Sequence, residues 1–120
     1  MPASKQKLEV ISAADAIQYE ALWPLLESMR EEYSELSKKK PDGTLNKLKV
    51  HGVNRLLTDL KELLKNETII RYLDLLSDDD LPQYSDVTII LSQYVAAMKS
   101  FKQARWYQDA NYNMVWRLSK

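Results

Sequence analysis

The last third of the chain, residues 84–120, decides the fold, and it reads YSDVTIILSQYVAAMKSFKQARWYQDANYNMVWRLSK. Its first half carries apolar side chains at spacings of 4, 3, 4 and 3, namely Val87, Leu91, Tyr94, Met98 and Phe101. Residues three and four apart share a helix face, so this spacing predicts one amphipathic helix. The next two positions of the same stripe are Arg105 and Gln108. The apolar stripe is therefore broken after Phe101.

An earlier segment, roughly residues 13–38, shows the same helical spacing. Its apolar stripe consists of Tyr19, Leu22, Leu26, Met29, Tyr33 and Leu36. Ser12 is a favourable N-cap, with Asp15 in the capping-box position three residues later. Pro24 lies inside the segment and cannot donate a helical hydrogen bond. We therefore expect a long helix with a kink before Pro24, or two helices that meet there.

A second long helix is predicted after the turn at Pro41-Asp42-Gly43, with Thr44 as its cap. Its buried face would comprise Val53, Leu56, Leu57, Leu60, Leu63 and Leu64. A short third helix is expected over residues 68–76, and residues 77–83 are the clearest loop. Ser85 is the expected cap of the last helix. The predicted fold class is all-α: an antiparallel helical bundle of three long helices and one short one, because short links make consecutive helices neighbours.

Composition fits this class. The chain has 120 residues, 45% of them hydrophobic and 28% charged, which is typical of a globular domain. It contains only two glycines, whereas β-rich folds and phosphate-binding loops depend on glycine. It contains no cysteine, which excludes disulfides, thiolate nucleophiles and cysteine-ligated zinc. We expect one domain over residues 1–120, with residues 1–11 as a lead segment able to be flexible.

Charge is balanced overall but uneven along the chain. Residues 86–120 hold five basic and two acidic side chains, while the net charge of the whole chain is zero. This basic excess is small compared with that of most nucleic-acid-binding domains. The first residues lack the apolar core of a signal peptide, and no apolar run reaches the ~20 residues that span a bilayer. These observations predict a cytoplasmic protein without a membrane segment.

Carboxylates on the first two helices suggest an enzymatic alternative. Glu32 and Glu35 lie three residues apart on one predicted helix, and Asp59 and Glu62 lie three apart on the next. Facing helices with such pairs can hold Mg²⁺. Glu32-x-x-Glu35 resembles the first half of the motif of the MazG-type nucleotide pyrophosphohydrolases, whereas the second half is inverted here. The resemblance implies Mg²⁺ as cofactor, but the preferred interpretation is a solvated face paired with lysines and no metal site.

His51 is the only histidine, so a histidine cluster for a metal is excluded. It lies in no recognisable nucleophile motif, and a structural or solvent-facing role is the preferred interpretation. The glycine that follows, Gly52, is expected to permit a close helix crossing or a local irregularity.

Aromatic and basic residues crowd the end of the chain. The candidate partner-binding residues are Arg105, Trp106, Tyr107, Tyr112 and Trp116. Trp, Tyr and Arg dominate the energetic centres of protein interfaces, and cations among flat rings also bind single-stranded nucleic acid. Alternatively, Tyr112 and Trp116 fold back to complete the core. Asn111 and Asn113 are poor helix formers, so residues 106–120 form either a helix or an extended or partner-ordered tail.

The sequence thus predicts a small non-enzymatic interaction or accessory protein that docks through its C-terminal aromatic and basic segment. Its partner would be another protein or a second copy of itself. A Mg²⁺-dependent pyrophosphohydrolase and a weak single-stranded nucleic-acid binder are the alternatives.

Overall fold

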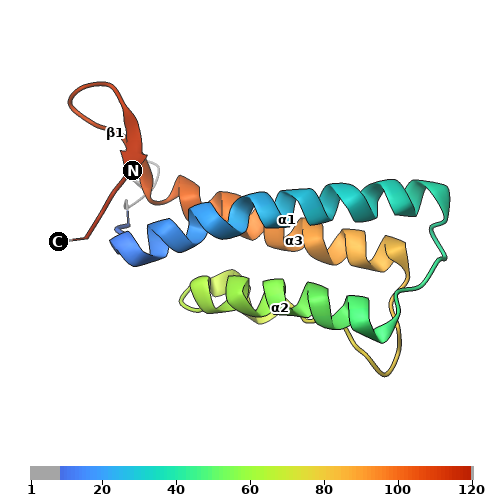
Figure 1. Ribbon diagram of the computed structural model, residues 1–120. Coiled ribbons are helices and arrows are strands. Elements are labelled where there is room, and N and C mark those ends of the chain that lie inside the picture. Colours follow the sequence, from blue (N-terminus) through green and yellow to red (C-terminus); the bar gives the residue numbers. More distant parts are fainter. Residues whose placement is uncertain (1–8, 120) are drawn as a thin grey trace, which may run out of the picture.

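Three helices form the body of the protein, and a small hairpin projects from one end of it (Figure 1). The computed structural model describes residues 9–119. Its elements are α1 (Ala13–Lys39), α2 (Lys47–Leu63), the 3-10 helix η1 (Thr68–Tyr72), α3 (Tyr84–Gln103), β1 (Trp106–Gln108) and β2 (Met114–Trp116). The prediction of a mainly helical bundle is confirmed. Of the predicted lead segment, residues 1–11, the first eight lie outside the described residues.

The longest helix, α1, packs antiparallel along α3. Early α1 contacts late α3, since the Tyr19 hydroxyl donates to the Met98 carbonyl at 3.0 Å. Late α1 contacts early α3, since Arg30 Nε donates to Ser92 Oγ at 3.1 Å. Ser12 caps α1 as predicted, accepting from the Asp15 backbone N–H. The helix continues through Pro24, so the predicted junction of two helices there is wrong.

The connection from α2 to α3 differs from the prediction. Instead of a helix over residues 68–76, the chain forms the single short η1 and then extends over residues 73–76. Asn54 of α2 holds this extended stretch, because its side chain donates to the Leu76 carbonyl and accepts from the Leu76 N–H. The return segment carries the chain back along the bundle, so α2 and α3 run in the same direction (Figure 1).

Two helix caps lie elsewhere than predicted. Asn46 caps α2 by accepting from the Lys49 N–H, whereas Thr44 forms an isolated bridge with Gln83. Gln83 is the N-cap of α3 in place of Ser85, and Asp86 completes a capping box with it. Each correction moves the cap by two residues, which is the usual uncertainty of a helix boundary.

The core lies between the three helices and includes the predicted stripes. Its largest buried side chains include Tyr19 and Leu26 of α1, Leu57 and Leu60 of α2, and Leu91, Tyr94 and Met98 of α3. The two least exposed tyrosines are hydrogen-bonded, as fully buried hydroxyls must be: Tyr19 to the Met98 carbonyl and Tyr94 to the Asp74 carbonyl at 2.8 Å. Gly52 has open space around it, so the predicted close crossing there is wrong.

After α3 the chain forms a hairpin, which is neither a continued helix nor an unpaired tail. Trp106 pairs with Trp116, Tyr107 with Val115 and Gln108 with Met114. The turn has a local cause, because the Asp109 carboxylate accepts from the backbone N–H groups of Asn111 and Asn113. Tyr112 takes the left-handed conformation in it, with φ of 64°.

The first described residues are ordered against this hairpin. Ile11 is buried and lies beside Leu118 in a parallel bridge, in which the Ile11 N–H donates to the Arg117 carbonyl and the Ser119 N–H donates to the Ile11 carbonyl. Glu9 donates its N–H to the Ala104 carbonyl. The lead segment is therefore attached to the body from at least Glu9 onward.

No helix in the described part of the chain is both long and apolar enough to cross a bilayer.

Candidate interaction surface

Arg105 lies at the base of the hairpin and is turned inward. Only 7% of the residue is exposed. Its guanidinium donates to both carboxylate oxygens of Glu67, at 3.0 and 3.3 Å, and to the carbonyl of Phe101. It also contacts the carboxylate of Glu9. The structure therefore gives this candidate partner-binding residue an internal role, joining α3, η1 and the N-terminal segment.

The two hairpin tryptophans pack against each other and against α1. Their rings meet edge to face with centroids 5.3 Å apart, and Trp116 lies 4.9 Å from the ring of Tyr19. Trp116 Nε1 donates to Glu20 at 3.0 Å. The Lys102 ammonium lies 4.1 Å above the Trp106 ring and 3.8 Å from the Glu20 carboxylate. Trp116 thus packs against the end of the protein's own core, as the core-completing interpretation expected of it, whereas Tyr112, the other residue of that interpretation, does not.

The remaining two aromatic candidates lie away from this cluster. Tyr107 is on the opposite face of the hairpin, where the guanidinium of Arg117 is 5.8 Å from its ring. Tyr112 is at the tip and is 81% exposed. The five candidates consequently do not form one continuous surface.

The pairing of the hairpin leaves one long strand edge open. The Arg117 N–H donates to the Arg105 carbonyl, and the Asp109 N–H donates to the Asn113 carbonyl. These two pairs, and the Tyr107–Val115 pair between them, are therefore the hydrogen-bonded pairs of the hairpin. In the other two pairs, Trp106–Trp116 and Gln108–Met114, the backbone N–H and C=O groups point outward from the hairpin. On β2 these outward-pointing groups belong to Met114 and Trp116. Within residues 9–119 they have no backbone partner.

Leu118 extends this edge by one more step. The residues on either side of it, Arg117 and Ser119, form backbone hydrogen bonds with Ile11, which lies on the β1 side of the strand. The N–H and C=O of Leu118 therefore point to the other side, together with those of Met114 and Trp116. We call residues 114–118, seen from this side, the β2 edge.

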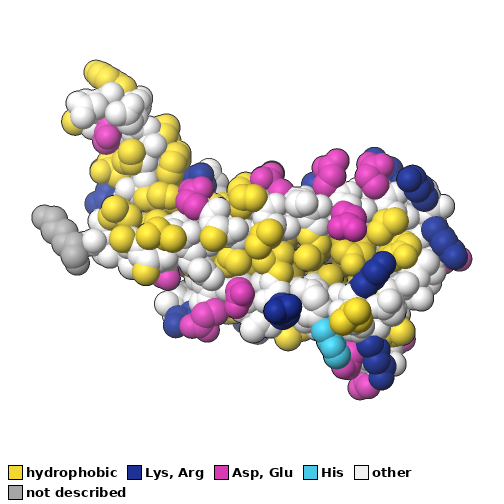
Figure 2. Space-filling model, viewed as in Figure 1, with side chains coloured by type: hydrophobic (Ala, Val, Ile, Leu, Met, Phe, Trp, Pro, Cys, Tyr) yellow, Lys and Arg dark blue, Asp and Glu magenta, His cyan; other side chains and the backbone are white. Residues whose placement is uncertain are grey.

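An apolar groove of about 530 Å³ lies beside the β2 edge. It runs between the hairpin and the first turns of α1, and its lining includes Ala13, Ile17, Glu20, Met114, Trp116 and Leu118. Three of these apolar residues are largely exposed: Ile17 is 71%, Leu118 52% and Met114 50% accessible. Figure 2 shows apolar side chains gathered on the hairpin and the adjoining end of the bundle. Charged side chains are sparse there by comparison.

The acidic residues of the enzymatic alternative do not come together. Glu32 and Asp59 are exposed, Glu35 pairs with Lys38 at 3.1 Å, and Glu62 pairs with Lys65 at 2.9 Å. The hydrogen bond that the Lys65 ammonium donates to Glu62 raises the pKa of that ammonium. Within residues 9–119 no three His, Asp or Glu side chains are grouped so as to hold a metal ion. Glu35 and Glu62 thus each pair with a lysine on an exposed helix face.

His51 is exposed and pairs with Asp78 at 3.2 Å, in the acidic loop before α3. This hydrogen bond lowers the pKa of the Asp78 carboxyl. The contact ties the loop to α2 and provides no nucleophile.

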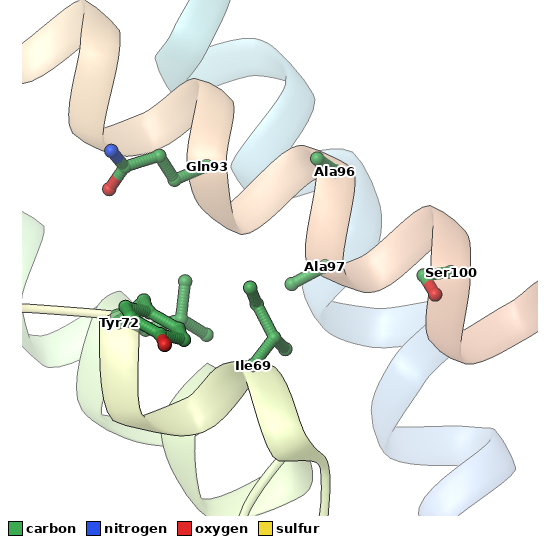
Figure 3. A pocket seen from close by; sticks show the side chains of 7 residues that line it. Ile69, Tyr72, Gln93, Ala96, Ala97 and Ser100 are labelled. Carbon is green, nitrogen blue, oxygen red and sulfur yellow. The ribbon is translucent and has the colours of Figure 1, made fainter.

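A second apolar concavity, of about 350 Å³, lies between η1 and α3. Ile69 and Tyr72 of η1 face Gln93, Ala97 and Ser100 across it (Figure 3). It has no open strand edge and no charged lining residue, so its geometry specifies no ligand class.

The groove residue Ile17 and the β2 edge were missed at the sequence level, although a signal for the edge is present. Met114, Trp116 and Leu118 alternate with polar or smaller residues at a period of two, which is typical of a half-buried strand. Ile17 falls outside the stripe of α1 and is by itself an ordinary exposed residue.

Comparison with known proteins gives no further guidance, since no family model, curated protein or solved structure matches this chain.

Proposed function

We propose that this protein is an interaction domain that binds an extended segment of a partner protein along the β2 edge. The observation that carries the proposal is the row of outward-facing backbone groups at Met114, Trp116 and Leu118, directly beside an apolar groove. Added strands bind in this way: backbone hydrogen bonds supply affinity, and pockets for alternate side chains supply specificity.

The chemistry of the edge specifies its occupant. Unpaired strand N–H and C=O groups are matched by another strand, which presents the same groups at the same spacing. The groove beside them is almost entirely apolar, with Glu20 as its one charged lining residue. A suitable partner segment is therefore extended and carries apolar side chains at alternate positions.

Nucleic-acid binding is less well supported by the same region. Lys102 lies near Trp106, but it is also next to Glu20, which offsets its charge. Arg105 is buried in ion pairs with carboxylates. The aromatic and cationic residues are thus largely used within the protein.

A displayed library of random linear peptides, selected against the full chain, tests the proposal. Selected peptides should lose affinity about tenfold when Met114→Pro removes an outward N–H from the β2 edge. The matched control is Gln108→Pro, because Gln108 is the cross-strand partner of Met114 and its N–H points out from the opposite edge. Ile17→Glu, which places a charge in the groove, should also weaken binding.

Circular dichroism establishes that each variant is folded before binding is measured. If the bound peptides respond equally to Met114→Pro and Gln108→Pro, or to neither, binding along the β2 edge is ruled out.

A further inference from the structure

We infer that the partner strand is the β2 edge of a second copy of this chain, so that two hairpins form one four-stranded antiparallel sheet. The inference rests on the proposed function and names its partner. It follows from four properties of the edge: its register, its charges, its apolar side chains and its limited protection against self-pairing.

The register is self-complementary. Outward-facing residues occur at positions 114, 116 and 118, symmetrically about Trp116. In a two-fold antiparallel pairing, Trp116 lies opposite Trp116 of the second copy, and Met114 lies opposite Leu118 of the second copy. All three positions then become hydrogen-bonded pairs, with up to about six backbone hydrogen bonds across the junction.

Charge selects this register over its neighbours. Arg117 falls opposite Val115 of the second copy when the pairing is centred on Trp116. A shift toward the C-terminus would centre the pairing on Arg117 and place two guanidinium groups directly opposite each other, which is destabilising. A shift the other way, centred on Val115, leaves Leu118 without a partner and loses hydrogen bonds. The centred register is therefore the most favourable.

The side chains of the junction also match. Met114, Trp116 and Leu118 lie on the face of the hairpin that packs toward α1, beside Ile17. Pairing places the apolar side chains of the second copy alongside this groove. The apolar surfaces of the two copies then contact each other.

The edge has few of the devices that prevent self-association. Natural edge strands are protected by proline, by inward-pointing charges, by bulges or by being very short, and of these β2 has only its short length of three residues. Residues 114–118 read MVWRL, with no proline and with a single charge that lies on the opposite face from Met114 and Trp116. Because the junction is short, we expect a weak dimer whose population depends on concentration.

Sedimentation velocity over a concentration series measures the association. The wild-type chain should shift from monomer to dimer as concentration rises, and Met114→Pro should raise the dissociation constant by about tenfold. The Gln108→Pro control should associate like the wild type. Leu118→Pro, at the other end of the same edge, should reproduce the effect of Met114→Pro.

Disulfide trapping tests the register directly, and the absence of native cysteine removes any background. Val115 and Arg117 of opposite copies form a non-hydrogen-bonded pair, in which Cα atoms are close enough for a disulfide. A mixture of Val115→Cys and Arg117→Cys chains should therefore give a cross-linked heterodimer under mild oxidation, in excess over either homodimer.

The two proposals fail separately. A wild-type chain that stays monomeric at all concentrations, without preferential cross-linking of positions 115 and 117, overturns the second-copy inference. The proposed function then stands if selected peptides still depend on the β2 edge, and falls with it if they do not.

Discussion

Arg105 and Glu67 form a two-contact ion pair across the end of the bundle, with Nη2 to Oε2 at 3.0 Å and Nη1 to Oε1 at 3.3 Å. Arg105 follows α3, and Glu67 is the N-cap residue of η1, so the pair fixes the start of the hairpin to the far end of α2. Planar two-contact pairs of this kind are directional as well as strong. The position of the β2 edge therefore depends on a contact that lies outside the hairpin.

Removing the Glu67 carboxylate should be costly. The Glu67 side chain is 21% exposed and that of Arg105 8%, so Glu67→Gln leaves a buried guanidinium with one carboxylate fewer. We expect a loss of about 3 kcal/mol in the free energy of unfolding, measured by urea denaturation. Glu9→Gln is the matched control, because the Glu9 side chain is 54% exposed, and it should cost less than about 1 kcal/mol. Equal losses for the two variants would contradict this ranking.

Asn54 should contribute more to the stability of the fold than its half-buried position on α2 indicates. Its amide makes two hydrogen bonds to the backbone of Leu76, at 2.8 and 2.9 Å. Asn54→Leu leaves both backbone groups without that partner and should destabilise the protein by about 2 kcal/mol. Hydrogen exchange at the Leu76 amide should accelerate well beyond the change seen at α1 amides. Unchanged exchange at Leu76 would show that the return segment is held by other contacts.

Replacing each of the two glycines by alanine should change the stability of the protein in opposite directions. A Cβ at Gly43 would approach the ring of Tyr84 to 2.6 Å, so Gly43→Ala should destabilise by about 1 kcal/mol. A Cβ at Gly52 would meet no atom within 4 Å, and the residue lies inside α2. Gly52→Ala should therefore stabilise by about 1 kcal/mol, through the higher helix propensity of alanine. Thermal melting of both variants beside the wild type measures these shifts.

Alkaline pH should destabilise the fold through its buried tyrosines, because burial raises the pKa of Tyr33 as well as those of Tyr19 and Tyr94. Burial, with a smaller contribution from Glu20, raises the pKa of Tyr19, and burial followed by Asp74 raises that of Tyr94. A raised pKa means that the folded state retains protons which the unfolded state loses above about pH 10. Their contribution to stability is thus complete below about pH 10 and falls as pH rises beyond it.

The double variant Tyr19→Phe/Tyr94→Phe checks this assignment. It should be less stable than the wild type at pH 8, because two buried hydrogen bonds are lost. Its free energy of unfolding should decline less steeply between pH 9 and 11. Parallel pH profiles for the two proteins would show that other groups govern the alkaline transition.

The helical body was predictable from sequence because its signals are repeated. The stripes of Tyr19 to Leu36 and Val87 to Phe101 repeat their spacing over several turns, and a single misplaced cap does not alter them. The interpretation failed where structure depends on distant contacts. Residues 73–76 are extended because Asn54 binds Leu76, and no local pattern reveals that pairing.

The hairpin shows the same division. Asn111 and Asn113 made an extended segment one of the two expectations for residues 106–120, and the alternation of Met114, Trp116 and Leu118 is present in the sequence. The burial of Arg105 could not be predicted, because its partners Glu9 and Glu67 lie 96 and 38 positions away in sequence. An arginine among aromatic residues has the same sequence signature whether it binds a partner or an internal carboxylate.

The contacts that position the hairpin also determine when it can dock on the bundle during folding. Trp116 to Glu20 and Arg105 to Glu9 each join residues 96 positions apart, so each closes a loop that spans most of the chain. The entropic cost of closing such a loop is smaller once α1 and α3 have packed together, because their packing already brings the two ends close. The docking of the hairpin on the bundle should therefore come late in folding, although the hairpin itself is a local pairing of residues 106–116 and can form early. A partner that needs both the β2 edge and the groove beside α1 should select chains in which this docking is complete.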